Sequence, residues 1–98
     1  MARPSQLSLE DAKESILLKL NEGKFELSFH CRYDSMPKRN IDETDILNVL
    51  ETGEIRREPE WSEEYQNWKY RVEGLDLDDD ELTVITVILD EILVITAF

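Results

Sequence analysis

The chain has 98 residues, of which 41% are hydrophobic, and it carries 11 basic and 23 acidic side chains. This length predicts one domain with a single core, because domains typically hold about 100 to 200 residues. The formal net charge of −12 repels the phosphate backbone of nucleic acids, so a nucleic-acid role requires a local basic site. The hydrophobic fraction excludes a disordered acidic tail.

The cysteine content and the apolar runs indicate a cellular location. The single cysteine, Cys31, excludes an intramolecular disulfide. The first residues lack the apolar core of a secretion signal, and the longest apolar run, 82–89, is about half the length that spans a bilayer. We therefore expect a cytoplasmic protein of bacterial type with no membrane segment.

The first third of the chain predicts a helix and then a strand. Apolar residues recur at helical spacing after Ser8, which predicts a helix over about residues 9–22 with Ser8 as its N-cap. A period of two then predicts a short strand that ends at His30. The buried face of this strand would consist of Phe25, Leu27 and Phe29.

A second helical region follows. The polar stretch 31–40 predicts a short helix or turn, in which Pro37 disfavours the α conformation for the residue before it. The next helix begins at Asp42, which we expect to cap the N–H of Asp45, and ends at Gly53 as its C′ residue. Its expected buried stripe is Ile46, Leu47, Val49 and Leu50.

The C-terminal half predicts strands. Residues 54–58 alternate and predict an edge strand that Pro59 ends. Residues 60–66 predict a loop, and residues 68–73 predict a strand with charges on its outer face. The β-branched runs 82–89 and 92–98 are separated by two residues, which predicts a hairpin of central strands. Asp90-Glu91 lacks the usual turn glycine, so the sequence leaves a longer turn open.

These elements predict an α+β domain over residues 1–98, in which N-terminal helices and a short strand pack on a C-terminal antiparallel β-meander. The two hairpin runs are apolar on both faces, so we expect helices to cover one face and a loop or a second subunit to cover the other. The protein is therefore expected to form a homo-oligomer.

Several short motifs recur in one order: Phe29-His30-Cys31, then Met36 to Ile41, then a helix ending in Gly53-Glu54-Ile55, then a closing run 94–98. Together they resemble the bacterial domain-of-unknown-function family 4258 over roughly residues 25–98. The matching residues are His30, Met36, Arg39, Ile41, Gly53, Glu54 and Ile55. The chain departs from the family pattern in having Ser35 where the family has arginine, Asn40 where it has glycine, and one more residue between His30 and Met36.

This resemblance implies a function. Some members of the family look like toxins of toxin–antitoxin pairs, and their element order is similar to that of small metal-independent ribonucleases and ribosome-dependent toxins. In such sites a histidine acts as general acid or base, while arginine and lysine stabilise charge that develops on phosphorus. The candidate catalytic residues are then His30 and Arg39. The candidate substrate-binding residues are Arg32, Lys38, Lys69 and Arg71. RNA or the ribosome would be the partner.

A second interpretation is not catalytic. His30 also fits a structural role at a strand end, and Arg39 a role in packing or ion pairing. The protein would then be an acidic binding protein that docks a basic protein partner or associates with itself. The sequence leaves open whether the protein is an enzyme.

The sequence indicates no metal and no cofactor. One histidine and one cysteine fall short of a zinc site, and the acidic run 76–81 lacks the central glycine of a calcium loop. Cys31 lies beside His30, but neighbours on a strand point to opposite faces, so a thiol nucleophile is disfavoured. Cys31 instead fits the alanine position of the family pattern as a small buried residue.

Overall fold

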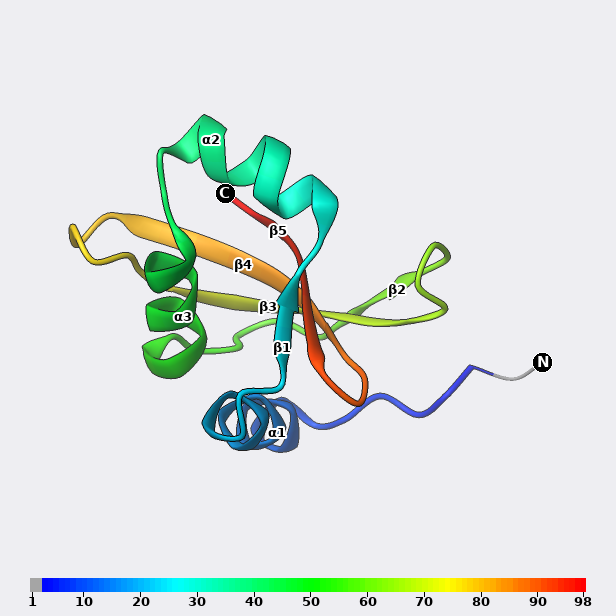
Figure 1. Ribbon diagram of the computed structural model, residues 1–98. Helices are drawn as coiled ribbons and strands as arrows, with labels where there is room; N and C mark the ends of the chain where they lie inside the picture. Colours follow the sequence, from blue (N-terminus) through cyan, green and yellow to red (C-terminus); the bar gives the residue numbers. More distant parts are fainter. Residues whose placement is uncertain (1–2) are drawn as a thin grey trace.

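The first helix begins at the cap that the sequence predicts, since the Ser8 hydroxyl accepts a hydrogen bond from the Asp11 N–H. The computed structural model describes residues 3–98 (Figure 1). In chain order the elements are α1 (Leu9–Asn21), β1 (Phe25–Leu27), the π-helical segment η1 (Cys31–Ser35), α2 (Met36–Arg39), α3 (Glu43–Thr52), β2 (Glu60–Ser62), β3 (Asn67–Leu75), β4 (Glu81–Ile88) and β5 (Ile92–Ala97). This arrangement confirms the predicted α+β class.

The strands form one five-stranded sheet in the order β1-β5-β4-β3-β2. Strands β2 to β5 are antiparallel neighbours and confirm the meander, whereas β1 pairs in parallel with β5. Figure 1 shows β1 beside β5 at the edge of the sheet. The first strand is therefore part of the sheet itself, and the two ends of the family-like region meet there.

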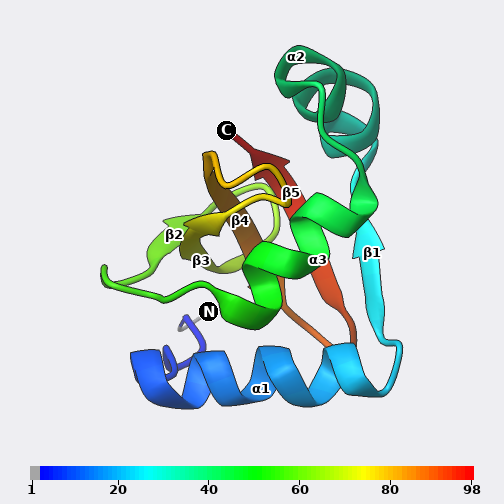
Figure 2. The ribbon, with the colours of Figure 1, turned by 90° about the vertical axis from the view of Figure 1, so that its left-hand side faces the viewer.

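The core lies between one face of the sheet and the helices α1 and α3, which cross that face (Figure 2). Ile16 of α1 and Leu50 of α3 are fully buried with Val72 and Val84 of the sheet. Burial of an aliphatic side chain of this size contributes about 1.5 to 3 kcal/mol. Among the described residues no helix is long and apolar enough to cross a membrane.

Asp42 caps the N-terminus of α3 as predicted, and Asp45 completes a capping box there. The Asp42 carboxylate accepts the Asp45 N–H at 3.1 Å, and the Asp45 carboxylate accepts the Asp42 N–H at 3.0 Å. At the other end of the helix, Lys13 Nζ donates to the carbonyl of Leu50 at 2.7 Å. Both ends of α3 therefore have polar partners for helical groups that would otherwise lack them.

Gly53 ends α3 for a different reason from the one expected. Its φ is −75°, so it does not adopt the left-handed C′ conformation. A Cβ at this position would lie 2.6 Å from the oxygen of Val49 and 2.7 Å from that of Glu73. Gly53 is thus required by the close approach of α3 to β3, where the Glu54 N–H donates to Glu73 O at 2.8 Å.

The first strand is shorter than predicted. It ends at Leu27, a helical segment begins at Phe29, and Phe29 is 79% exposed instead of buried. Ser28 causes the change, because its hydroxyl accepts the Cys31 N–H at 3.1 Å in the manner of a helix cap. The predicted end of the strand at His30 is therefore wrong.

The segment 31–40 was expected to be a short helix or a turn, and it is helical. Met36 adopts the α conformation (φ −64°, ψ −47°) although Pro37 follows it, so the expectation for Met36 is wrong. Pro37 lies in the first turn of α2, where a missing N–H costs little. Asn40 then takes the left-handed conformation (φ 54°) that the family's glycine would supply.

The edge strand also lies further along than predicted. Residues 55–57 form no strand, and Glu54 makes only an isolated bridge to Glu73. Ile55 packs against the core. Pro59 has no N–H to donate to a neighbouring strand, so regular strand pairing starts only after it, at Glu60 of β2. Residues 60–62 therefore form the edge strand, and only 63–66 form the turn that was expected over 60–66.

Candidate functional site

A β-bulge shapes the sheet face that α1 and α3 leave free. Ile85 pairs with Thr96, but the next residue of β4 pairs with Val94, so Ile95 is an extra residue on β5. Val94 is buried on the helical face, and the bulge turns both Ile95 and Thr96 to the opposite face. We call this opposite face the open face.

The open face carries a pocket of about 300 Å³. Its apolar wall consists of Ile85, Ile95 and Phe98. Its charged and polar lining consists of Arg57, Glu58, Glu60, Lys69, Arg71 and Thr96. Lys69 and Arg71 are two of the six candidate residues from the sequence, and the alternation of β3 places both on this face, as expected.

Three arginines gather around one carboxylate at the edge of this pocket. Glu73 lies 3.0 Å from Arg71 Nε, 3.8 Å from Arg56 and 4.0 Å from Arg57. The Arg71 guanidinium also lies 5.2 Å from the centre of the Phe98 ring. One carboxylate cannot use all the donors of three guanidinium groups, so free N–H donors remain for an anionic ligand. We call Arg56, Arg57 and Arg71 the arginine cluster.

The cluster also borders a second pocket of about 450 Å³, which Arg56, Arg71 and Glu73 line together with the start of β4. The sequence pattern did not point to Arg56 or Arg57 as site residues, because their alternation predicts an edge strand. The sequence does contain one indication of this cluster, namely two adjacent arginines between two strands. Their position beside Arg71, however, depends on the bridge between Glu54 and Glu73.

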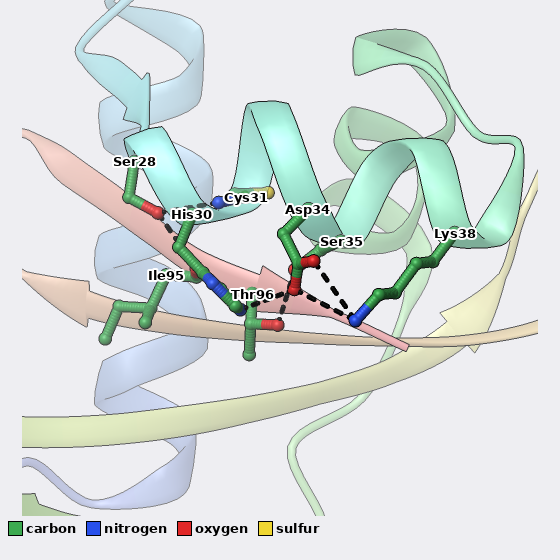
Figure 3. A network of polar contacts seen from close by, with 8 residues as sticks. All are labelled: Ser28, His30, Cys31, Asp34, Ser35, Lys38, Ile95 and Thr96. Carbon is green, nitrogen blue, oxygen red and sulfur yellow. Dashed lines mark hydrogen bonds and ion pairs between the residues drawn. The ribbon is translucent and has the colours of Figure 1, made fainter.

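The only histidine lies on a segment fixed to the wall of the first pocket (Figure 3). The Ser28 hydroxyl donates to the Ile95 carbonyl at 2.8 Å, and the hydroxyls of Ser35 and Thr96 lie 2.7 Å apart. Ser28 and Ser35 flank His30 in the sequence, and both of their partners line the pocket. The segment therefore continues the edge of β5 where β1 stops, and two residues of the pocket lining hold it in place.

His30, Asp34 and Lys38 project from one side of this segment, as Figure 3 shows. Asp34 lies 3.6 Å from His30 Nε2 and 3.1 Å from Lys38 Nζ. The His30 side chain is 57% exposed, so these pairs add little to stability. Their effect is geometric, because Asp34 holds the imidazole and the ammonium group on the same side of the helix.

The remaining candidate residues, Arg39 and Arg32, do not line the first pocket. The Arg39 guanidinium donates to the carbonyl of Glu81 at 2.7 Å, beside the second pocket and away from the lining of the first. Arg32 is exposed and makes no ion pair with any residue from 3 to 98. The structure thus brings Lys69 and Arg71 into one pocket and fixes the segment of His30 and Lys38 to two residues of its lining, whereas Arg39 and Arg32 do not line this pocket.

Cys31 belongs to the core. It is fully buried among the helices and β5, and burial raises the pKa of its thiol. Within residues 3–98, no group of three His, Cys, Asp or Glu side chains could hold a metal ion.

Comparison with known proteins agrees with the predicted resemblance. The family model described as "Domain of unknown function (DUF4258)" matches residues 27–98. The match runs from the last residue of β1 through β5, and so it includes every residue of the open-face pocket and of the histidine segment. No significant match was found among curated proteins or among solved structures.

Proposed function

The chain belongs to the DUF4258 family of domains of unknown function, and we propose that it is a metal-independent ribonuclease of the toxin kind whose site is the open-face pocket. One observation carries the proposal. Lys69 and two members of the arginine cluster line the pocket, and the segment that contains the only histidine is hydrogen-bonded to two other residues of that lining. RNA or ribosome-bound RNA is the proposed substrate.

The pocket supports phosphodiester binding. Guanidinium groups recognise phosphate oxygens with two parallel hydrogen bonds, and the Glu73 carboxylate keeps the arginine cluster close together before any ligand binds. The apolar wall of Ile85, Ile95 and Phe98 is suited to a ribose or a base. Preorganised cations of this kind stabilise charge that develops on phosphorus.

The proposed chemistry needs no metal. The neutral imidazole of His30 removes the proton of a ribose 2′-hydroxyl, and the 2′-oxygen attacks the adjacent phosphorus. The bond from phosphorus to the 5′-oxygen breaks, and the departing oxygen takes a proton from water. The products are a 2′,3′-cyclic phosphate and a 5′-hydroxyl end. Lys69 and Arg71 bind the phosphate oxygens during the displacement.

Cleavage of single-stranded RNA in the presence of EDTA, with and without ribosomes, tests the proposal. We expect wild-type protein to cleave, and His30→Ala or Arg71→Gln to lower the rate by about 100-fold or more. Lys24→Gln is the matched control, since Lys24 pairs with Glu22 outside the site. Arg39→Ala is measured alongside: an equal loss would place Arg39 in phosphate binding, and an unchanged rate would limit it to its contact with Glu81.

A second candidate function follows from the charge. The chain carries 23 acidic residues, and Glu58 and Glu60 line the same pocket as the arginines. An acidic surface of this kind suits a binding protein that docks a basic partner or another copy of itself. If wild-type protein cleaves no RNA while His30→Ala folds normally, His30 is structural and this second function replaces the first.

A further inference from the structure

Two aromatic rings stand in solvent on the histidine segment. Phe29 is 79% exposed and Tyr33 is 68% exposed. Their ring centres are 4.5 Å apart and their planes are inclined by 41°. Large aromatic side chains are usually buried at least in part, and a paired, exposed set of them typically marks a contact surface.

The backbone beneath the two rings is held firmly. Cys31 and Ser35 form the buried side of the same segment, and Ser35 is tied to Thr96. Phe29 and Tyr33, four residues apart, lie on another side of the segment and point away from the core. The rings are thus presented to solvent on a fixed base, which reduces the conformational entropy lost on binding.

The charge around the rings identifies the partner. Arg32 lies between them in the sequence, is exposed, and pairs with no acidic side chain among residues 3–98. The stretch 24–39 carries four basic and two acidic residues, whereas residues 72–98 carry eight acidic and none basic. Paired aromatic rings beside a cation bind single-stranded RNA, because bases stack on the rings while the cation contacts a phosphate.

We propose that Phe29 and Tyr33 form a stacking platform for unpaired bases of single-stranded RNA, with Arg32 contacting an adjacent phosphate. This inference rests on the proposed function and specifies its substrate, because a base on the platform places the following phosphodiester near His30, the residue next to Phe29. A duplex hides the faces of its bases and cannot use the platform. The protein therefore selects single-stranded RNA over duplex RNA.

Fluorescence anisotropy with a labelled ten-nucleotide RNA and its duplex tests the platform. The double variant Phe29→Leu/Tyr33→Leu keeps apolar side chains but removes the rings, and Phe29→Tyr/Tyr33→Phe keeps both rings. We expect the first to weaken single-strand binding by about 10-fold or more and the second to change it by less than about 2-fold. Leu18→Ala is the control, because Leu18 is 61% exposed on α1.

The possible results separate the platform from the proposed function. If Arg71→Gln weakens binding but the leucine variant does not, the platform is wrong and the phosphate site stands. If wild-type protein prefers duplex RNA, the platform is also wrong. If wild-type protein binds no RNA, both proposals fail. Should the leucine variant instead abolish self-association without changing RNA binding, the rings are a protein contact and the platform is overturned.

Discussion

Substitution of Gly53 by alanine tests the packing of α3 on the sheet that positions the arginine cluster. The new Cβ would meet Val49 O at 2.6 Å, Glu73 O at 2.7 Å and a methyl of Val72 at 3.0 Å. Both oxygens already accept backbone hydrogen bonds, from the N–H groups of Gly53 and Glu54. They cannot move away without breaking these bonds, so α3 and β3 must separate.

The expected loss follows from two opposing effects. Overpacking at a well-packed contact costs about 1 to 3 kcal/mol, and rigid backbone obstacles place this site in the upper half of that range. Alanine is compatible with the φ of −75°. It also lowers the conformational entropy of the unfolded chain, which stabilises the folded protein by about 0.4 to 1 kcal/mol. The net loss is about 2 kcal/mol, which corresponds to a melting temperature lower by about 8 to 16 °C.

Thermal unfolding followed by circular dichroism measures this loss, with Gly23→Ala as the control. Gly23 has a φ of +73° and no atom within 4 Å of its would-be Cβ. Its substitution carries only the cost of the left-handed conformation, about 1 kcal/mol. If Gly53→Ala were as stable as wild type, or more stable, the close approach of α3 and β3 would be refuted.

Three further predictions concern the cap, the thiol and the pocket. Hydrogen bonds from the Thr44 hydroxyl and from the backbone hold the pKa of Asp42 below its usual value; its stabilising effect should therefore be present above about pH 4 and be lost as pH falls through the lowered pKa. Urea midpoints should show this loss in wild type and a weaker one in Asp42→Asn, while Asp42→Ala lowers the midpoint at neutral pH; identical profiles would contradict the cap. Because Cys31 is fully buried and burial raises the pKa of its thiol, Ellman's reagent should label it only in denaturant, and rapid labelling of native protein would show the packing to be wrong. Replacing Glu58 and Glu60 by glutamine removes negative charge from the pocket lining, which should strengthen RNA binding by about 2- to 5-fold at low salt and less at high salt; weaker binding would argue against a phosphate site there.

Local signals in the sequence were sufficient for most of the fold. The Ser8 and Asp42 caps and the alternation of β3 each depend on residues close together in the chain, and the structure has them where they were predicted. The C-terminal hairpin is also present, but its turn is longer than two residues, since Ile88 pairs with Ile92 and residues 89–91 form the connection. The predicted end of the first strand failed for a local reason. Phe29 follows the alternation of a strand, but the Ser28 hydroxyl caps a helical segment at that point, and alternation alone carries no information about such a cap.

The candidate site was predictable only in part. Alternation placed Lys69 and Arg71 on the outer face of their strand, and the family pattern pointed to His30. Their proximity depends on the bulge at Ile95 and on the hydroxyl contact between Ser35 and Thr96, which no sequence pattern indicated. The arginine cluster was missed because Arg56 and Arg57 reach Glu73 through a single bridge between segments distant in sequence.

The most direct test of the central claim is an NMR titration of ¹⁵N-labelled protein with a short single-stranded RNA made uncleavable by 2′-O-methyl groups. If the open-face pocket binds RNA, the amide signals of Lys69, Arg71, Ile85 and residues 95–98 should shift in a salt-sensitive way, while those of α1 stay in place. The absence of shifts at these residues, or shifts confined to α1, would contradict the claim.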